Sequence, residues 1–396
     1  MCGITGFVTA GGMGTEELTA RVRRMACCLA HRGPDDSGEW VDAAAGVALG
    51  HRRLSIVDLS LEGHQPMHSA CGRYVMVFNG EVYNFADLRQ ELEPKGHTFR
   101  GHSDTEVMLA AIREWGLEAA LQHFIGMFAL ALWDREERVL SLARDRLGIK
   151  PLYYGWAHGT FLFASELKAI RAYPDFEPQV DRGSLALFLR FGCIPQPHSI
   201  YQGIGKLPPG SVLSLKQRGS REWNRQEVQN YWSMGEVAQR AAEAPFKGTA
   251  QEAADELERL LRDAIRRRLI ADVPLGAFLS GGIDSSVVVA LMQTESSRPV
   301  RTFTLGFRED AFNEAVHAKA VAAYLGTDHT DAYVTAEEAL AVVPRLPVYY
   351  DEPFADSSQI PTCLVSALAR RHVTVTLSGD GGDELFGGYD RYTIAP

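Results

Sequence analysis

The chain has 396 residues, of which 46% are hydrophobic and 23% are charged, proportions that are ordinary for a soluble globular protein. At about 100–200 residues per domain, this length favours two domains. The formal net charge of -10 leaves no basic face of the kind that nucleic acid requires, so we expect no nucleic-acid partner.

The cysteines include no CxxC pair, which argues against a zinc site, and their small number fits a reducing compartment. The N-terminus lacks the basic and long apolar regions of a signal peptide. No apolar run reaches the length of about 18 residues that a membrane-spanning helix needs. We therefore expect a cytoplasmic protein without a membrane partner.

The first part of the chain, to about Ala172, predicts strands with interspersed helices. The expected strands are short apolar runs bounded by turn residues, and the expected helix spaces its apolar residues at helical intervals. The strands are 75–78, which ends in a turn at Asn79-Gly80, then 124–134, its hairpin partner 138–144, and 161–164; the helix is 106–115.

A transition rich in proline and polar residues follows, and we place the domain boundary between about 210 and 250. Residues 211–248 are predicted to connect the domains, with the later part packing mostly on the second. From about Thr249, helical stretches alternate with the β-rich runs 275–279, 300–305 and 373–377. Strands separated by helices indicate a parallel sheet with helices on its faces.

The first chemical feature is a cysteine directly after the initiator methionine. If Met1 is removed, Cys2 carries both a thiol and a free α-amine. An α-amine has a pKa near 7.7–8.0, well below the value of about 10.4 for lysine. At physiological pH it is therefore partly neutral and can take the thiol proton. The resulting thiolate is a strong nucleophile. Alone this signal is weak, because a cysteine at this position is more often incidental.

Asn79 and Gly80 follow the predicted strand 75–78. A nucleophile that attacks a carboxamide creates an oxyanion, which a side-chain amide and a neighbouring backbone N–H can stabilise. The competing interpretation is a hairpin turn, since Asn-Gly is the strongest short hairpin signal. The two residues alone favour the turn.

Arg53 and Asp104 are candidates for holding the two ends of an α-amino acid. Arginine suits bidentate binding of a carboxylate, and Asp104 could receive an ammonium group. Asp104 precedes a predicted helix, so the alternative is that it only caps that helix.

The order of several motifs resembles class II glutamine amidotransferases. These are Cys2-Gly3-Ile4, His31-Arg32-Gly33-Pro34-Asp35, Arg53-Leu54-Ser55-Ile56, Asn79-Gly80-Glu81 and Ser103-Asp104. The resemblance implies an αββα sandwich of the N-terminal nucleophile type, in which Cys2 attacks glutamine and Asn79 and Gly80 form the oxyanion hole. It also implies that glutamine is held by the side chains of Arg53, Asn79, Glu81 and Asp104 and by backbone groups near Leu54 and Ile56.

The segment 274–292 reads as strand, glycine-rich turn and helix, with the turn Ser280-Gly281-Gly282-Ile283-Asp284-Ser285-Ser286. Glycines let the backbone approach an anion, and a helix N-terminus offers N–H groups to phosphate. Asp284 would repel phosphate unless Mg²⁺ bridges them, so we interpret it as a metal ligand. The loop lacks the lysine of the GxxxxGK[ST] motif, which is compatible with cleavage between the α- and β-phosphates. A generic glycine-rich turn is the weaker alternative.

A second glycine-rich run follows the predicted strand 373–377 and reads Ser378-Gly379-Asp380-Gly381-Gly382-Asp383-Glu384. A flexible loop is one interpretation. Clustered carboxylates repel one another unless a cation shares them, so Mg²⁺ held between Asp284 and Asp383 explains the pattern better. We expect Mg²⁺ with ATP as a substrate and no organic prosthetic group.

Both loops resemble the synthetase domain of glutamine-dependent asparagine synthetases, in which ATP adenylates a carboxylate and ammonia displaces AMP. The resemblance implies an α+β amidotransferase domain at 2–210, a connecting segment at 211–248, and a doubly wound α/β ATP-pyrophosphatase domain at 249–396. Asp380 stands where many members have a glutamate tied to the acyl-adenylate step, and its side chain is shorter by one methylene group. The implied nucleotide contacts are Leu279, Ser280, Gly281, Gly282, Asp284, Ser285, Ser286, Leu305, Ser378 and Gly379.

The sequence thus predicts asparagine synthesis from aspartate, glutamine and Mg-ATP, or amidation of another carboxylate in a peptide, sugar or secondary metabolite. RNA modification and a non-catalytic regulatory role are disfavoured by the negative charge and by the intact Cys2 and Asp284. Members of the resembled family continue beyond the run 386–389, so we expect a chain that is incomplete at its C-terminus. The oligomeric state stays open, with a homodimer as one option.

Overall fold

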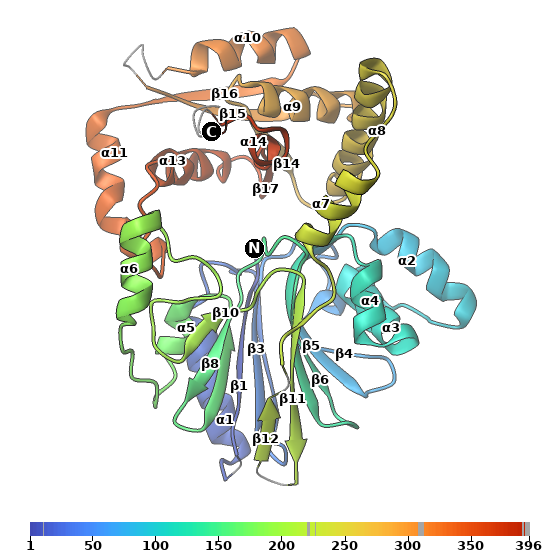
Figure 1. Cartoon of the computed structure of the whole chain (residues 1–396), viewed down its shortest axis with the longest axis vertical. Coiled ribbons are helices and arrows are strands. Elements are labelled where there is room, and N and C mark those ends of the chain that lie inside the picture. Colours follow the sequence, from blue (N-terminus) through green and yellow to red (C-terminus); the bar gives the residue numbers. More distant parts are fainter. Residues whose placement is uncertain (11, 220–221, 226, 308–312, 390–391, 393–396) are drawn as a thin grey trace. The chain divides into compact units, whose positions relative to one another are not determined.

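The computed structural model describes residues 1–396 except 11, 220–221, 226, 308–312, 390–391 and 393–396. The chain divides into two compact units (Figure 1). The first comprises Met1–Pro245 and Tyr350–Ala355, and the second comprises Phe246–Tyr349 and Asp356–Pro396. No helix that the described ranges contain is both long and apolar enough to cross a membrane.

The first unit contains two antiparallel sheets and the helices that cover them. One sheet has the strand order β10-β8-β9-β1-β3-β2, and the other has the order β12-β11-β7-β6-β5-β4, with β13 paired to β11. The strands are β1 (Gly3–Val8), β2 (Asp36–Asp42), β3 (Val47–Arg53), β4 (Met67–His68), β5 (Tyr74–Val82), β6 (Gly126–Asp134), β7 (Val139–Arg144), β8 (Tyr153–Ala157), β9 (Thr160–Ala164), β10 (Ile204–Lys206), β11 (Ser211–Arg218), β12 (Glu222–Arg225) and β13 (Gln229–Asn230). The helices are α1 (Thr15–Cys27), α2 (Phe85–Leu92), α3 (Asp104–Trp115), α4 (Leu117–His123), α5 (Leu167–Arg171), α6 (Arg182–Phe191) and α7 (Met234–Glu243), with 3-10 turns at Leu61–Gly63 and Glu93–Lys95.

Three apolar clusters give the layer order of this unit. The central cluster lies between the sheets and joins β1 and β3 of one sheet to β5, β6 and β7 of the other. A second cluster packs α1 and α5 on the outer face of the first sheet, and a third packs α2, α3 and α4 on the outer face of the second (Figure 1). Because alternate side chains of a strand point to opposite faces, each sheet can contribute to two clusters. The expected αββα sandwich is confirmed.

The prediction of a hairpin turn at Asn79-Gly80 is wrong. Strand β5 continues to Val82, with Asn79 opposite Ala129 and Gly80 opposite Phe128 of β6. A Cβ atom at Gly80 would overlap the Met127 carbonyl oxygen, so glycine allows the two strands to approach here. The remaining predicted strands and the helix of this half are confirmed, and β6 and β7 form the expected hairpin.

The prediction that residues 211–248 connect the two domains is also corrected by the structure. Its first part is β11, which pairs with β7 of the second sheet, and Pro245 still belongs to the first unit. The apolar side chains of β11 alternate with polar ones, and Leu213 and Leu215 enter the central cluster. The polar composition of the residues that follow hid this period-two pattern from the sequence interpretation.

The second unit is a parallel sheet with the strand order β16-β15-β14-β17. One apolar cluster packs α8, α9 and α10 on one face, and a smaller one brings α13 to the other (Figure 1). The doubly wound sheet is confirmed. Its elements are α8 (Ala250–Arg268), β14 (Leu275–Phe278), α9 (Ile283–Glu295), β15 (Arg301–Phe307), α10 (Ala315–Leu325), β16 (Asp328–Val334), α11 (Ala336–Val342), α12 (Leu346–Tyr349), α13 (Gln359–Ala369), β17 (Val375–Leu377) and α14 (Gly382–Phe386), with a 3-10 turn at Val343–Arg345.

The strand order reverses direction beside β14. From β14 the chain moves outward on one side through β15 and β16, and then returns to the other side with β17. Ligands of such sheets bind outside the carboxyl ends of the strands where the order reverses. The loops that leave β14 and β17, where both predicted phosphate-binding runs lie, are therefore at the expected position.

Candidate active sites

The candidate nucleophile lies at the start of the sandwich. Strand β1 runs antiparallel to β3 with Gly3 opposite Arg52, which brings Cys2 to the loop that leaves β3. The Leu54 backbone N–H lies 3.4 Å from the Cys2 sulfur and donates to it. Burial raises the pKa of the Cys2 thiol, while the Leu54 contact and the nearby α-amine act in the opposite direction. The thiol therefore needs a base to become a thiolate.

The chain's own α-amine is the candidate base. With Met1 in place, burial lowers the pKa of the terminal amine to about 5, so the Met1 amine is mostly neutral at pH 7. The buried Lys150 side chain adds a second nitrogen, with Nζ 2.9 Å from the Met1 sulfur. Burial lowers the pKa of Lys150 to about 8. A neutral amine next to a thiol can accept its proton, which is the arrangement that the sequence predicts for Cys2.

Asn79 is the least satisfied polar residue of this region. Its side chain is fully buried, and neither its Nδ2 nor its Oδ1 atom has a hydrogen-bond partner among the described residues. A buried amide without partners costs about 1–3 kcal/mol, so such a group calls for an explanation. A substrate oxygen that accepts a hydrogen bond from Nδ2 would supply one.

Gly80 places a backbone N–H next to that amide. Phe128, which lies opposite Gly80, uses both its N–H and its carbonyl oxygen for Asp145 on the far side of β6. Gly80 therefore belongs to a non-hydrogen-bonded pair, and its N–H points away from β6.

The same edge of β5 carries the N–H groups of Phe78 and Val82, two residues before and after Gly80. Gln65 Oε1 accepts the Phe78 N–H at 2.7 Å, and Asp104 Oδ2 accepts the Val82 N–H at 2.9 Å. Between them, the Gly80 N–H donates to no side chain in the described part of the chain. Both donors predicted for an oxyanion are thus present and free to bind one.

Asp104 does not cap α3, because Ser103 occupies the N-cap and accepts the Glu106 N–H. The Asp104 carboxylate instead holds the end of β5 through Val82. Burial raises the pKa of Asp104 to about 6, partly offset by hydrogen bonds from Val82 and Thr105. A buried carboxylate without a cation attracts an ammonium group, which agrees with the predicted role at the amino end of glutamine.

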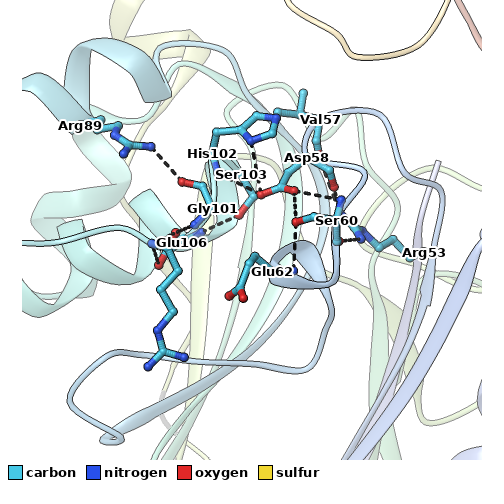
Figure 2. Close-up of polar contacts among 11 residues, drawn as sticks. Arg53, Val57, Asp58, Ser60, Glu62, Arg89, Gly101, His102, Ser103 and Glu106 are labelled. Atoms are coloured by element: carbon cyan, nitrogen blue, oxygen red, sulfur yellow. Dashed lines mark hydrogen bonds and ion pairs between the residues drawn. The ribbon is translucent and has the colours of Figure 1, made fainter.

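Arg53 is buried, and its guanidinium donates to the backbone carbonyl groups of Val57, Asp58 and Ser60. Figure 2 shows that Asp58 joins this loop to the one that precedes α3. Asp58 Oδ1 accepts from the Ser60 N–H and hydroxyl, and Oδ2 accepts the His102 N–H at 2.9 Å. Burial opposes ionisation of Asp58, but these hydrogen bonds outweigh it and lower its pKa. One network therefore fixes the loop that follows Arg53 and the loop that precedes Asp104.

The structure places three of the six predicted glutamine-site residues near Cys2. Charge interactions with the Cys2 sulfur place Arg53 and Asp104 near it, and Leu54 contacts it directly. Glu81 follows Gly80 on β5, and Ile56 lies in the loop after β3. The Arg53 guanidinium already donates to three carbonyl groups. A carboxylate would therefore have to accept from the guanidinium N–H groups that these contacts leave over.

The predicted pyrophosphate loop follows β14 as expected. Ser280 organises it, since its Oγ accepts the Gly282 N–H at 3.2 Å and contacts the Ser285 hydroxyl at 2.9 Å. Gly281 has φ of +83°, and a Cβ atom there would press on the backbone of α10. Helix α9 begins at Ile283 without a side-chain cap, which leaves its N-terminal N–H groups directed at the loop.

The second glycine-rich run lies against the first. A Cβ atom at Gly379 would be 2.8 Å from the Ser285 backbone nitrogen, and one at Gly382 would overlap the Asp284 carboxylate. Asp383 follows Gly382 at the start of α14, so the two predicted metal ligands come from neighbouring segments. Oxygen ligands from two carboxylates, completed by phosphate and water, suit Mg²⁺. The two side chains are thus of the ligand type that the predicted ion prefers.

The remaining predicted nucleotide contacts lie around these loops. Leu279 is buried at the end of β14, and its N–H donates to the Phe303 carbonyl group at 3.0 Å. Leu305 lies in the neighbouring strand β15. Asp380 is turned toward its own loop, where its Oδ2 accepts the Ser378 hydroxyl at 2.9 Å.

Sequence interpretation missed the residues that hold the first site in place. Gln65 fixes the Phe78 N–H, and the fully buried His51 contacts the Phe78 carbonyl oxygen at 3.0 Å. Burial lowers the pKa of His51 to about 3, so it is a neutral hydrogen-bonding group. Arg32, whose Nε donates to the Cys2 carbonyl oxygen at 2.8 Å, was quoted as part of a motif without a role. Only proximity in the fold reveals these functions.

Two protein families match the two halves of the chain. The glutamine amidotransferase domain matches residues 1–232, and asparagine synthase matches residues 256–396. Asparagine synthetase [glutamine-hydrolyzing] 1 of Bacillus subtilis is 36% identical over 99% of this chain and 59% of its own length. A putative asparagine synthetase of Methanocaldococcus jannaschii is 35% identical, over 98% of this chain and 76% of its own.

An amidase of Gibberella zeae is 31% identical, over 99% of this chain and 60% of its own length. The chain thus spans about three fifths of several relatives that it matches. Among solved structures, an allosteric regulatory enzyme of purine biosynthesis overlaps 75% of this chain and 64% of its own, at 18% identity and a TM-score of 0.42. That likeness is too slight to support a conclusion.

Proposed function

This chain belongs to the family of glutamine-hydrolysing asparagine synthetases, and we propose that it hydrolyses glutamine at Cys2 and passes the ammonia to an ATP-dependent site that amidates aspartate. The observation that carries the first half is the buried amide of Asn79, which has no hydrogen-bond partner among the described residues and lies next to the outward Gly80 N–H. A protein gains nothing from burying such a pair of donors unless something binds to them.

The proposed glutaminase step begins with transfer of the Cys2 thiol proton to the α-amine exposed by removal of Met1. The thiolate attacks the side-chain carbonyl carbon of glutamine, and Asn79 Nδ2 and the Gly80 N–H bind the resulting oxyanion. The carbon–nitrogen bond then breaks, and the departing nitrogen takes the proton to leave as ammonia. Water hydrolyses the thioester to glutamate and restores the thiol.

The proposed synthetase step takes place at the carboxyl ends of β14 and β17. The N-terminus of α9 and the hydroxyl groups of Ser280, Ser285 and Ser286 would bind the phosphates of ATP. Mg²⁺ held by Asp284 and Asp383 would neutralise the pyrophosphate that leaves when the acceptor carboxylate is adenylated. Ammonia then attacks the acyl carbon and releases AMP. Asp380 is proposed to act at this step from the same loop.

A related amidotransferase reaction on another carboxylate is the second candidate. It is favoured by the similarity to the Gibberella zeae amidase, which is nearly as extensive as the similarity to the synthetases. Both candidates share the glutamine and ATP sites and differ only in the acceptor. Under either candidate we place the protein in the cytoplasm and expect it to use Mg²⁺, and sedimentation analysis would test the proposed homodimer.

The test incubates the purified chain with glutamine, aspartate and Mg-ATP and measures glutamate, asparagine and pyrophosphate together by mass spectrometry and a coupled assay. Ammonium chloride replaces glutamine in a parallel reaction, and the Cys2→Ala variant runs beside both. Asparagine and pyrophosphate in equal amounts, with glutamine use lost in the variant, support the proposal.

Glutamate without asparagine keeps the glutaminase half and points to another acceptor or to a need for residues beyond this sequence. Replacing aspartate with a panel of peptide, sugar-acid and secondary-metabolite carboxylates then separates the two candidates. Absence of glutamate release, with Met1 shown to be removed, contradicts the proposal.

A further inference from the structure

A short segment of the second half of the sequence belongs to the first unit. Tyr350–Ala355 lies in the first unit, whereas the chain on both of its sides belongs to the second. Three contacts of this segment with the amidotransferase residues are polar and close. The Ala355 N–H donates to the Gly192 carbonyl group at 2.8 Å, and Asp351 and Glu352 each meet a lysine.

The nucleophile is the starting point of a chain of charged contacts that ends in this segment. Arg32 Nε donates to the Cys2 carbonyl oxygen at 2.8 Å, and Arg32 Nη1 donates to Glu166 Oε1 at 2.7 Å. Arg32 Nη2 is buried and has no partner among the described residues. Glu166 is therefore the only carboxylate found to hold the Arg32 guanidinium in the described part of the chain.

Lys168 carries the contacts from Glu166 to the segment. Its Nζ lies 2.7 Å from Glu166 Oε2 and 3.2 Å from Asp351 Oδ1. Its backbone N–H also donates to Asp351 Oδ2 at 2.9 Å, so Asp351 binds both the backbone N–H and the ammonium group of Lys168. The side chains of Arg32, Glu166, Lys168 and Asp351 are only 9–22% exposed, which limits screening by water and salt.

The ionisation of the middle residues agrees with this arrangement. Burial opposes the charged form of Glu166, but Arg32 and Lys168 outweigh it and lower its pKa. Burial likewise opposes the charged form of Lys168, yet Glu166 and Asp351 raise its pKa. Glu166 and Lys168 are thus both held in their charged forms next to each other.

Glu352 anchors the same segment without reaching Cys2. Its carboxylate lies 2.6 Å from Lys206 Nζ and accepts the Ile200 N–H at 2.8 Å. The Tyr153 hydroxyl group is a third neighbour at 3.3 Å. None of these partners contacts Arg32 or Glu166 through a hydrogen bond or ion pair in the described ranges. Two adjacent carboxylates therefore dock one segment, and only one of them connects to the nucleophile.

We propose that Asp351 and Lys168 are positioning residues for Cys2, acting through Glu166 and Arg32. Asp351 holds Lys168 by its backbone N–H and its ammonium group, and Lys168 in turn holds Glu166 Oε2, which keeps Glu166 Oε1 directed at Arg32. Arg32 in turn fixes the carbonyl group of Cys2 and with it the direction of the thiol. This inference rests on the proposed glutaminase reaction.

The experiment measures glutamate release as a function of glutamine concentration for the full chain and five variants. Asp351→Asn and Lys168→Met each remove one charge from the contacts that lead to Arg32, with little change in the size of the side chain. A third variant combines both substitutions. Glu352→Gln is the matched control, because it removes the neighbouring charge from the same segment. Lys168→Arg tests rescue by a cation, and thermal melting of every variant separates loss of folding from loss of positioning.

We expect kcat to fall about five- to tenfold in Asp351→Asn and in Lys168→Met, with KM for glutamine within about twofold because Arg53 and Asp104 are untouched. The kcat of the double variant should be no lower than that of either single variant, since both residues act through Glu166. Glu352→Gln should retain kcat within about twofold, and Lys168→Arg should restore most of the activity.

The inference is overturned if Asp351→Asn and Glu352→Gln lose the same activity, if the losses of the single variants multiply, or if KM alone changes. If the unsubstituted chain releases no glutamate, the proposed function fails instead, so the two failures are distinguishable. Equal melting temperatures of Asp351→Asn and Glu352→Gln with unequal kcat would be the clearest support.

Discussion

The two candidate sites differ in how completely the protein has organised them. Around Cys2, the end of β5 is fixed by Gln65, His51 and Asp104, and the Asn79 amide is the group left for a ligand. Around Ser280, the loop is held mainly by its own hydroxyl groups, and Asp284 meets a glycine-rich run instead of a rigid element.

The exposure of the neighbouring apolar side chains shows the same contrast. Leu385 and Phe386, which follow the second glycine-rich run, are 70% and 64% exposed, whereas the apolar residues of β5 are buried. A site on rigid strands is preorganised for a transition state, while a site on loops gains its order from the ligand. We therefore expect the glutaminase site to depend on single residues and the nucleotide site to depend on Mg-ATP.

Asn79→Ala is expected to have the largest effect among the substitutions that spare the nucleophile. Loss of one oxyanion donor costs about 2.7–4 kcal/mol, so kcat for glutamate release should fall about 10²–10³-fold with little change in KM. Because the part of the chain that the structure describes offers this amide no hydrogen-bond partner, the melting temperature should hardly change. Steady-state kinetics and calorimetry measure both quantities.

Asn84→Ala is the matched control for that prediction. Its amide donates to the His123 carbonyl group and accepts the Ile125 N–H, so its removal should lower stability by about 2 kcal/mol and leave kcat nearly unchanged. If both variants lose stability and keep their activity, Asn79 is a structural residue and the contrast between the sites disappears.

Asp284→Asn tests the second site. We expect the Mg²⁺-dependent affinity for ATP, measured by calorimetry, to fall about tenfold or more, because one of two carboxylates at the cation is lost. Glutamate release should be unaffected. Asp263 is an exposed residue of α8 that pairs with Arg267, and Asp263→Asn should change neither quantity. Equal ATP affinity with and without Mg²⁺ in the unsubstituted chain would contradict the assignment.

The pH dependence of glutamine use should report Asp104. Its pKa of about 6 belongs to the free enzyme, and the ionised form is the one that attracts the substrate ammonium group. As pH falls through about 6, the carboxylate is protonated, so kcat/KM should decrease and approach a tenfold loss per unit below that value. Bound glutamine favours the ionised form of Asp104. The decrease of kcat should therefore occur at a lower pH than the decrease of kcat/KM. A kcat/KM profile that stays flat to pH 5 is incompatible with this role.

The smallest expected effect is on the stability of the second unit. Thr249 and Glu252 form a capping box at the start of α8, with the Glu252 carboxylate accepting the Thr249 N–H at 2.7 Å. Thr249→Ala should lower the free energy of unfolding of this unit by about 1 kcal/mol. Thermal melting monitored with and without Mg-ATP measures it, and glutamate release should stay the same. A loss of glutaminase activity in this variant would show that the sites are not independent.

The sequence predicted the elements whose pattern is local. The apolar runs of β6, β7 and β9 and the loop from Ser280 to Ser286 were found because their periodicity or glycine content is decisive over a few residues. The Asn79-Gly80 turn was wrong because the local turn preference lost to the pairing of β5 with β6, which sequence spacing cannot show.

The supporting residues of the nucleophile were beyond sequence interpretation for the same reason. Glu166 lies more than a hundred residues from Arg32, and Asp351 is farther still, so no spacing rule joins them. Likewise β11 was assigned to a connecting segment, because its place beside β7 is set by long-range pairing. Motifs identified the reacting groups, and the fold identified what holds them.

The most direct test of the central claim is glutamate release by the purified chain and its Cys2→Ala variant, with intact-mass measurement of the N-terminus. Cys28→Ala controls for loss of a thiol, since Cys28 lies at the end of α1 away from the Leu54 contact. The account predicts release by the chain that lacks Met1, unchanged release by Cys28→Ala and background release by Cys2→Ala. Equal release by the unsubstituted chain and Cys2→Ala would contradict it.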